Sequence, residues 1–280
     1  MRLPDNFMFS QANLQDYVDC KRRFQLRYIY QLEWPAVESE PVSENEAFLE
    51  RGSAFHRLVH QYFLGLPEEQ LLKFVIELNF DKWWNAFLDY LPNLDIDRMQ
   101  VFPEIRMATQ LQGHRLMGRY DLILIGKGEV KIFDWKTTVH RQKRKVLEER
   151  MQTRVYPSLF FKEGHHLVRN KDFHINTIEM VYWFPEFPNE PEIFQFTEDQ
   201  LHKDLSYLQQ LIQEIESNLE EEYLMTDRIQ RCQYCRFRSF CNRGIEAGSE
   251  IDYETLFGQE KDEKSDLSLD FSLLPEIEFE

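Results

Sequence analysis

The middle of the chain constrains the fold most, because its apolar and polar residues alternate as they do in β-strands. Residues 100–112 and 114–125 alternate on either side of Gly113, which marks a turn. A second turn is indicated at Gly126-Lys127-Gly128, and residues 129–136 follow it as a third alternating stretch. We therefore expect an antiparallel meander of three strands at the centre of the domain.

Helical patterns flank this meander on both sides. Ser10 can cap a helix that reaches Tyr28. The remaining elements that we expect are helices at about 46–64, 68–90, 142–162 and 198–222, and strands at 174–184 and 192–197. This order predicts an α/β fold in which a mixed central sheet is flanked by helices and carries a helical insertion at about 46–95.

Two short motifs on the expected meander carry the chemistry. Gly118-Arg-Tyr-Asp121 ends one strand, and Asp134-Trp135-Lys136 ends the next. Asp134 and Lys136 are two residues apart on a strand and share a face, and the hairpin brings Asp121 beside Asp134. Two converging carboxylates suit a hard divalent ion such as magnesium or manganese, and Lys136 could orient an attacking water. An isolated Asp-x-Lys triplet is also common on exposed strand edges.

Four further residues could complete such a site. Glu104 lies on the preceding strand and could add a third carboxylate, and His56 lies within an expected helix. Gln152 and Tyr156 are four residues apart on another helix and therefore share a face. Taken singly, each has an ordinary alternative: a packed or surface histidine, a solvent-facing glutamine and a half-buried tyrosine.

The combined pattern resembles the RecB-like branch of the PD-(D/E)XK nucleases, whose motifs occur here in the same order. They are Gly52-x-x-x-His56, Glu104, Gly118-x-x-Asp121, Asp134-x-Lys136 and Gln152-x-x-x-Tyr156. The resemblance implies a restriction-endonuclease-like core. It also implies a metal held by the histidine, the glutamate, both aspartates and the Trp135 carbonyl. The lysine would assist the attacking water, and Gln152 and Tyr156 would lie beside the substrate strand.

The chain has four cysteines, of which one lies near the start and three are clustered near the end. They are Cys20, Cys232, Cys235 and Cys241. In a reducing compartment such a sparse set favours a metal or redox site over disulfides, and four thiolates accept either an iron–sulfur cluster or zinc. The spacing resembles the split site of the AddB and CRISPR-associated Cas-four nucleases. That resemblance implies a 4Fe-4S cluster joining the two ends of the domain, with zinc as the lesser alternative.

Net charge alone does not identify the partner. The chain carries −16, but residues 249–280 hold 11 acidic and 2 basic side chains. We expect that segment to be a flexible solubilising or docking tail, or else a cover over a DNA groove. Near the cysteines, Arg231, Arg236 and Arg238 could hold phosphate, although they could equally pair with nearby acids.

These features lead to one functional expectation and one rival. We expect residues 1–248 to form a single nuclease domain, with the cluster region at 226–245, that degrades DNA using magnesium or manganese. The resemblance implies an exonuclease that prefers single strands in repair, recombination or CRISPR-type processing, where a helicase could be a partner. The rival is a non-catalytic DNA-binding or assembly subunit. The chain has neither a run of about 18 apolar residues nor a secretory leader pattern, so a cytoplasmic protein is expected.

Overall fold

The structure is a computed structural model. It describes residues 3–4, 6–32, 40–126, 128–138, 140–168, 177–219, 222–232 and 235–244, with the side chains of the helix starting at Glu40 described from residue 50 onward. The expected tail at 249–280 lies outside the described residues, as does the expected beginning of the strand at 174–184.

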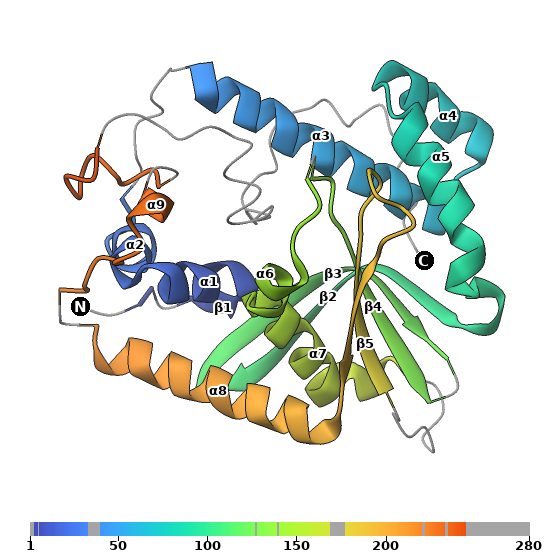
Figure 1. Cartoon of the computed structure of the whole chain (residues 1–280). Helices are drawn as coiled ribbons and strands as arrows, with labels where there is room; N and C mark the ends of the chain where they lie inside the picture. Colours follow the sequence, from blue (N-terminus) through green and yellow to red (C-terminus); the bar gives the residue numbers. More distant parts are fainter. Residues whose placement is uncertain are drawn as a thin grey trace.

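A mixed six-stranded sheet forms the centre of the molecule (Figure 1). Its strands are β1 (Met8–Ser10), β2 (Gln100–Leu111), β3 (His114–Ile125), β4 (Glu129–Trp135), β5 (Thr177–Trp183) and β6 (Glu192–Phe196). The predicted meander is confirmed, because β3 pairs antiparallel with both β2 and β4. β5 is parallel to β4, β6 is antiparallel to β5, and the short β1 is parallel to the beginning of β3.

Helices cover both faces of the sheet. They are α1 (Gln11–Asp19), α2 (Lys21–Phe24), α3 (Glu40–Phe63), α4 (Glu68–Glu77), α5 (Asp81–Tyr90), α6 (Arg144–Glu148), α7 (Met151–Glu163), α8 (Glu198–Ser217) and α9 (Ile229–Cys232). A π-helical turn, η1 (Gln25–Ile29), and the 3₁₀ turns η2 (Leu91–Leu94), η3 (Ile96–Arg98) and η4 (Gly164–His166) complete the elements. No helix of the described part combines the length and apolarity needed to cross a membrane.

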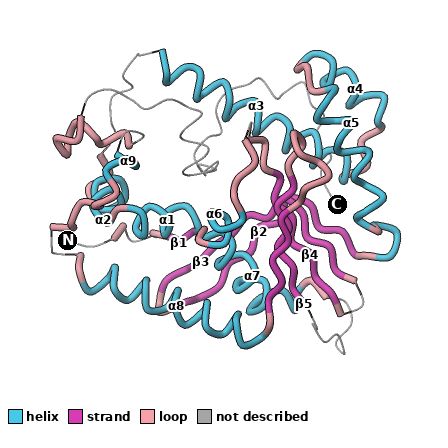
Figure 2. The backbone as a smooth tube through the Cα atoms, viewed as in Figure 1, coloured by secondary structure: helices cyan, strands magenta, loops and turns pink. Residues whose placement is uncertain are grey.

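The two faces of the sheet bury separate hydrophobic cores, as strand alternation requires. On β4, Ile132 belongs to the core beneath α1, α7 and α8, whereas Phe133 and Trp135 belong to the core beneath α3, α4 and α5. Figure 2 shows the strands between these two helical layers, with α3 above them and α8 below in the view. Helices α3, α4 and α5, which hold most of the residues expected as a helical insertion, therefore lie on one face of the sheet.

Several expected helices are interrupted. Ser10 caps α1 with its side chain, as predicted, but the helix stops where Cys20 adopts an extended backbone. The expected helix at 68–90 is divided where Asn79 has a φ of +53°. The expected helix at 142–162 is divided into α6 and α7 by the extended backbone of Arg150. Periodicity missed these breaks because apolar spacing continues on both sides of each.

Candidate functional site

Strand register places three carboxylates side by side across the sheet. β2 and β3 pair immediately on both sides of Glu104 and Asp121, which puts these two residues opposite each other. The β3–β4 pairing ends at Leu122 opposite Phe133, so Asp121 and Asp134 are the next residues beyond the end of this ladder. The sheet therefore aligns residues that are 30 positions apart in the sequence, between Glu104 and Asp134.

The backbone is distorted at the first member of this row. Glu104 has a φ of +47°, in the left-handed region that side chains larger than glycine rarely adopt. The in–out alternation of side chains along β3 shifts by one residue beside Glu104. Tyr120 and Ile123 both face the first core although they are three residues apart, whereas regular alternation requires an even number. Such a conformation costs on the order of 1 kcal/mol and is typical of functional sites. Here it accompanies a carboxylate that is aimed at its neighbours.

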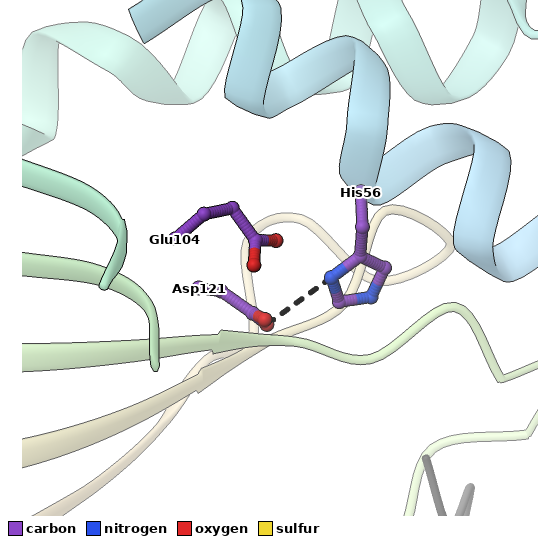
Figure 3. A group of neighbouring side chains, drawn as sticks. All are labelled: His56, Glu104 and Asp121. Carbon is purple, nitrogen blue, oxygen red and sulfur yellow. Dashed lines mark ion pairs between the residues drawn. The ribbon is translucent and has the colours of Figure 1, made fainter. Parts of the chain in front are cut away.

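His56 on α3 completes a compact group with Glu104 and Asp121, as Figure 3 shows. One ligand atom from each residue lies within 4.8 Å of the other two. The imidazole Nδ1 is 3.2 Å from Asp121 Oδ2, and both side chains are buried. The neighbours of His56 on α3, Phe55 and Val59, anchor the helix in the second core. A buried and a half-buried carboxylate beside an imidazole are a donor set that fits a divalent cation.

Asp134 lies beside this group in a ring of three side chains. Lys136 Nζ is 2.6 Å from Asp134 Oδ2 and donates a hydrogen bond of 2.9 Å to Gln152 Oε1. Gln152 Nε2 in turn donates to Asp134 Oδ1 at 2.5 Å. The backbone N–H of Trp135 donates to Asp121 Oδ2 at 2.8 Å and so joins the ring to the histidine group. Asp134 itself is not one of the residues within 4.8 Å of one another.

Tyr156 lies beneath the carboxylates, and its side chain is only 2% exposed. Burial raises the pKa of its hydroxyl, and the nearby Asp134 and Asp121 raise that pKa further, so the phenol stays protonated. A Cβ on Gly118 would lie 3.2 Å from Leu159 and 3.3 Å from the Tyr156 ring, so this glycine lets α7 approach β3 closely. Gln152 thus reaches the ring of polar side chains, whereas Tyr156 supports it from below.

Sequence reasoning missed Arg119. Its Nε donates a hydrogen bond of 2.6 Å to Glu104 Oε2, and its side chain is 50% exposed. The sequence offered a basis for predicting the contact between Arg119 and Glu104. Arg119 lies two residues before Asp121 on one strand and opposite the part of β2 that carries Glu104.

The four cysteines line one small cavity of about 20 Å³. Cys20 enters it from the break between α1 and α2, and Cys232 ends α9. Burial raises the pKa of Cys235 to about 11, and Cys20 and Cys241 contribute in the same direction. Among the described residues, however, no three of these sulfurs lie within 4.8 Å of one another. The structure thus brings the cysteines to one place without drawing them into a tight ligand group.

Ion pairs tie the two ends of the chain together beside this cavity. Buried Asp19 pairs with Arg231 and, at 3.3 Å, with Arg23. Arg238 donates a hydrogen bond of 3.4 Å to the Cys235 carbonyl, and Arg236 is exposed. Arg231 and Arg238 thus make contacts within the protein, and a nucleic-acid role for these three arginines stays a prediction.

Comparison with known proteins identifies the family. Residues 8–242 match the PD-(D/E)XK nuclease superfamily. The fold is similar to that of a protein of Eubacterium rectale described as a "putative exonuclease", at 14% identity, 90% coverage of this chain, 97% of that one and a TM-score of 0.51. A structure designated SSO0001 matches at 16% identity, 86% and 89% coverage and a TM-score of 0.41, which carries no argument. No curated protein matches the chain. The family match covers most of the chain, which therefore belongs to the PD-(D/E)XK nuclease superfamily.

Proposed function

We propose that this protein is a divalent-metal-dependent deoxyribonuclease that hydrolyses phosphodiester bonds. The observation that carries the proposal is the convergence of His56, Glu104 and Asp121 next to the ring formed by Asp134, Lys136 and Gln152. An oxygen-rich set with one imidazole suits magnesium or manganese. A subunit that only bound DNA would have no need for buried carboxylates clustered beside a lysine.

Each side chain has a role that its contacts support. His56, Glu104 and Asp121 would hold the ion. The resemblance of the motifs adds Asp134 and the Trp135 carbonyl as further ligands. When bound, the ion would acidify water and stabilise charge on the phosphoryl group.

Lys136 is oriented by Asp134 and Gln152, so its ammonium can position an attacking water and balance negative charge that develops on the phosphate. Gln152 would help to hold this arrangement at the substrate strand. Tyr156 would keep α7 in register beneath it.

The direct test compares cleavage of an end-labelled single strand by the wild type, Lys136→Ala and a matched control, Lys131→Ala, on the same strand β4. With magnesium or manganese we expect the first variant to lose at least about a hundredfold in rate, and the control to match the wild type. Equal rates for the wild type and Lys136→Ala would overturn the role of the lysine. A wild type that binds the strand but cleaves it with neither ion would favour the non-catalytic alternative.

An exonuclease that prefers single strands is the finer proposal. It is supported by the RecB-like motif order and by the description of the Eubacterium rectale protein. Circular and linear single strands of one sequence separate the two modes of cleavage, because an exonuclease leaves the circle intact. The process served, whether repair, recombination or CRISPR-type processing, and a helicase partner remain predictions that genomic neighbours would narrow.

We also propose that the cysteine cavity holds a 4Fe-4S cluster. Tetrahedral zinc, with Zn–S bonds of about 2.3 Å, places its sulfurs only about 3.8 Å apart. No three sulfurs of the described cysteines are within 4.8 Å of one another, so the protein alone does not hold them at zinc-ligand distance. The preference for a cluster rests on the cysteine spacing, which resembles the split cluster site of the Cas-four and AddB nucleases. Anaerobic purification should give brown protein with broad visible absorption and about four irons per chain. Colourless protein containing one zinc ion per chain would overturn the cluster proposal in favour of a zinc site.

A further inference from the structure

The outer face of the β2–β3 hairpin carries three exposed arginines. Arg106 lies directly opposite Arg119, and Arg115 lies four residues before Arg119 on the same side of β3. We call this set the arginine face. The opposite side of the hairpin is buried against the first core through Met107 and Leu116, so the arginines point away from the protein interior.

Two of the three charges on this face are not balanced by any residue that the structure describes, and only Arg119 has an ion-pair partner, Glu104. Like charges directly opposite each other on paired strands are destabilising, yet Arg106 and Arg119 occupy such a pair. Arg106 and Arg115 have neither an ion pair nor a hydrogen bond to any residue that the structure describes. Glu104 is the only acid on β2, and it belongs to the metal group. In a chain with a net charge of −16, this face is a local concentration of positive charge.

The arginine face is continuous with the candidate metal centre. Arg119 donates to Glu104 Oε2 at 2.6 Å, so the innermost arginine touches a proposed metal ligand. On α3, His60 lies near enough to Glu104, Arg119 and Arg57 to feel their charges, and burial lowers its pKa, which keeps it neutral near pH 7. A negatively charged, extended nucleic-acid strand that lay along this face would therefore reach the metal centre.

We propose that the arginine face binds the sugar–phosphate backbone of single-stranded DNA and leads it to the metal centre. This inference rests on the proposed nuclease function and names the path of its substrate. Arg115 and Arg119 are about 14 Å apart along β3, which is roughly two phosphate-to-phosphate intervals of an extended DNA single strand. Between the arginines lie Ala108 and Met117, and Met8 on the neighbouring β1 is 42% exposed, so bases have apolar surface to rest on.

The test replaces the two arginines that do not touch the metal group. Arg106→Gln/Arg115→Gln is compared with Lys73→Gln/Lys203→Gln, which removes the same charge from exposed positions on α4 and α8. Binding of a fluorescent single-stranded oligonucleotide is measured by anisotropy in EDTA over a range of salt, so that cleavage is not needed. Melting temperatures check that both variants are folded.

We expect the arginine variant to bind about tenfold more weakly at low salt than the wild type. Its log–log salt slope should be shallower by about 1.4, because each lost phosphate contact on a single strand is worth about 0.7. The lysine control should stay close to the wild type. In the cleavage assay with metal, KM should rise while kcat is retained.

Equal weakening in both double variants, or no binding by the wild type, would overturn the arginine face as the DNA path. A wild type that binds through these arginines but cleaves nothing would leave the path standing and remove the nuclease function. The two failures are therefore distinguishable.

Discussion

The candidate metal centre and the cysteine cavity both gather side chains from distant parts of the chain, but to different degrees. His56, Glu104 and Asp121 have ligand atoms within 4.8 Å of one another. The four cysteines share a cavity, yet no three of their sulfurs are that close among the described residues. One site is assembled to ligand distance by the protein itself, and the other is only approximately assembled.

The elements that carry the two sites explain this difference. The carboxylates lie on hydrogen-bonded strands, where register fixes neighbours at about 4.8 Å, and α3 is packed over them by a large aromatic core. The cysteines lie at a helix break, at the end of the four-residue α9 and in turns, close to the ion pairs that Asp16 makes with Arg23 and Asp19 makes with Arg231. A bound cluster would supply the cohesion that packing does not, so its binding energy would become folding energy.

Among variants that distinguish the candidate metal centre from the cysteine cavity, Asp121→Asn should have the largest effect. We expect cleavage to fall by about a thousandfold with little change in the melting temperature, because the amide can still accept from the Trp135 N–H. Rates with magnesium and manganese, together with thermal melts, measure this. Asp89→Asn on the exposed side of α5 is the control. A large loss of stability with retained cleavage would mean that the metal centre is structural.

Cys20→Ser should show the opposite pattern. Losing the one cysteine from the N-terminal end opens a loop of more than two hundred residues, which costs roughly 3 kcal/mol or more. For a chain of this size that lowers the melting temperature by roughly 10 °C. Iron content should fall, while any cleavage by the folded fraction persists. Unchanged iron content and stability would show that Cys20 is not a ligand of the cluster in the cysteine cavity.

Asp19→Asn tests the ion pairs that support the cavity. Removing this buried carboxylate takes the Asp19 ion pair from the mostly buried Arg231, whereas Arg23 keeps its ion pair with Asp16 at 2.6 Å, so we expect a cost of about 2 kcal/mol. Denaturant unfolding measures the loss. Asp227→Asn, on an exposed turn, is the matched control. If the two variants are equally stable, the cavity is held by packing instead.

The smallest effect should come from Gly118→Ala. The added methyl would meet Leu159 and Tyr156 at 3.2–3.3 Å, which displaces α7 slightly and costs about 1 kcal/mol. Because α7 carries Gln152, we expect the cleavage rate to fall clearly even though the melting temperature falls only slightly. A melting temperature and a rate equal to those of the wild type would show that α7 is free to shift.

Much of the site was predictable because strand and helix periods are local. Alternation placed Asp134 and Lys136 on one face, and Gln152 and Tyr156 were expected together on a helix. We could not predict that Asp134 contacts Lys136 and Gln152. These contacts leave Asp134 beside the group of His56, Glu104 and Asp121 and not within it. Arg119 was overlooked, since its contact with Glu104 depends on which face of the hairpin each residue takes.

The sequence by itself determined the meander, the flanking helices and the set of candidate site residues, because these depend on short-range periodicity and residue type. Only the tertiary structure decided that Glu104 takes a left-handed backbone, that the alternation of β3 changes phase there, and that α3 brings His56 over the sheet. These features depend on packing between segments about fifty residues apart, and no local pattern encodes that packing.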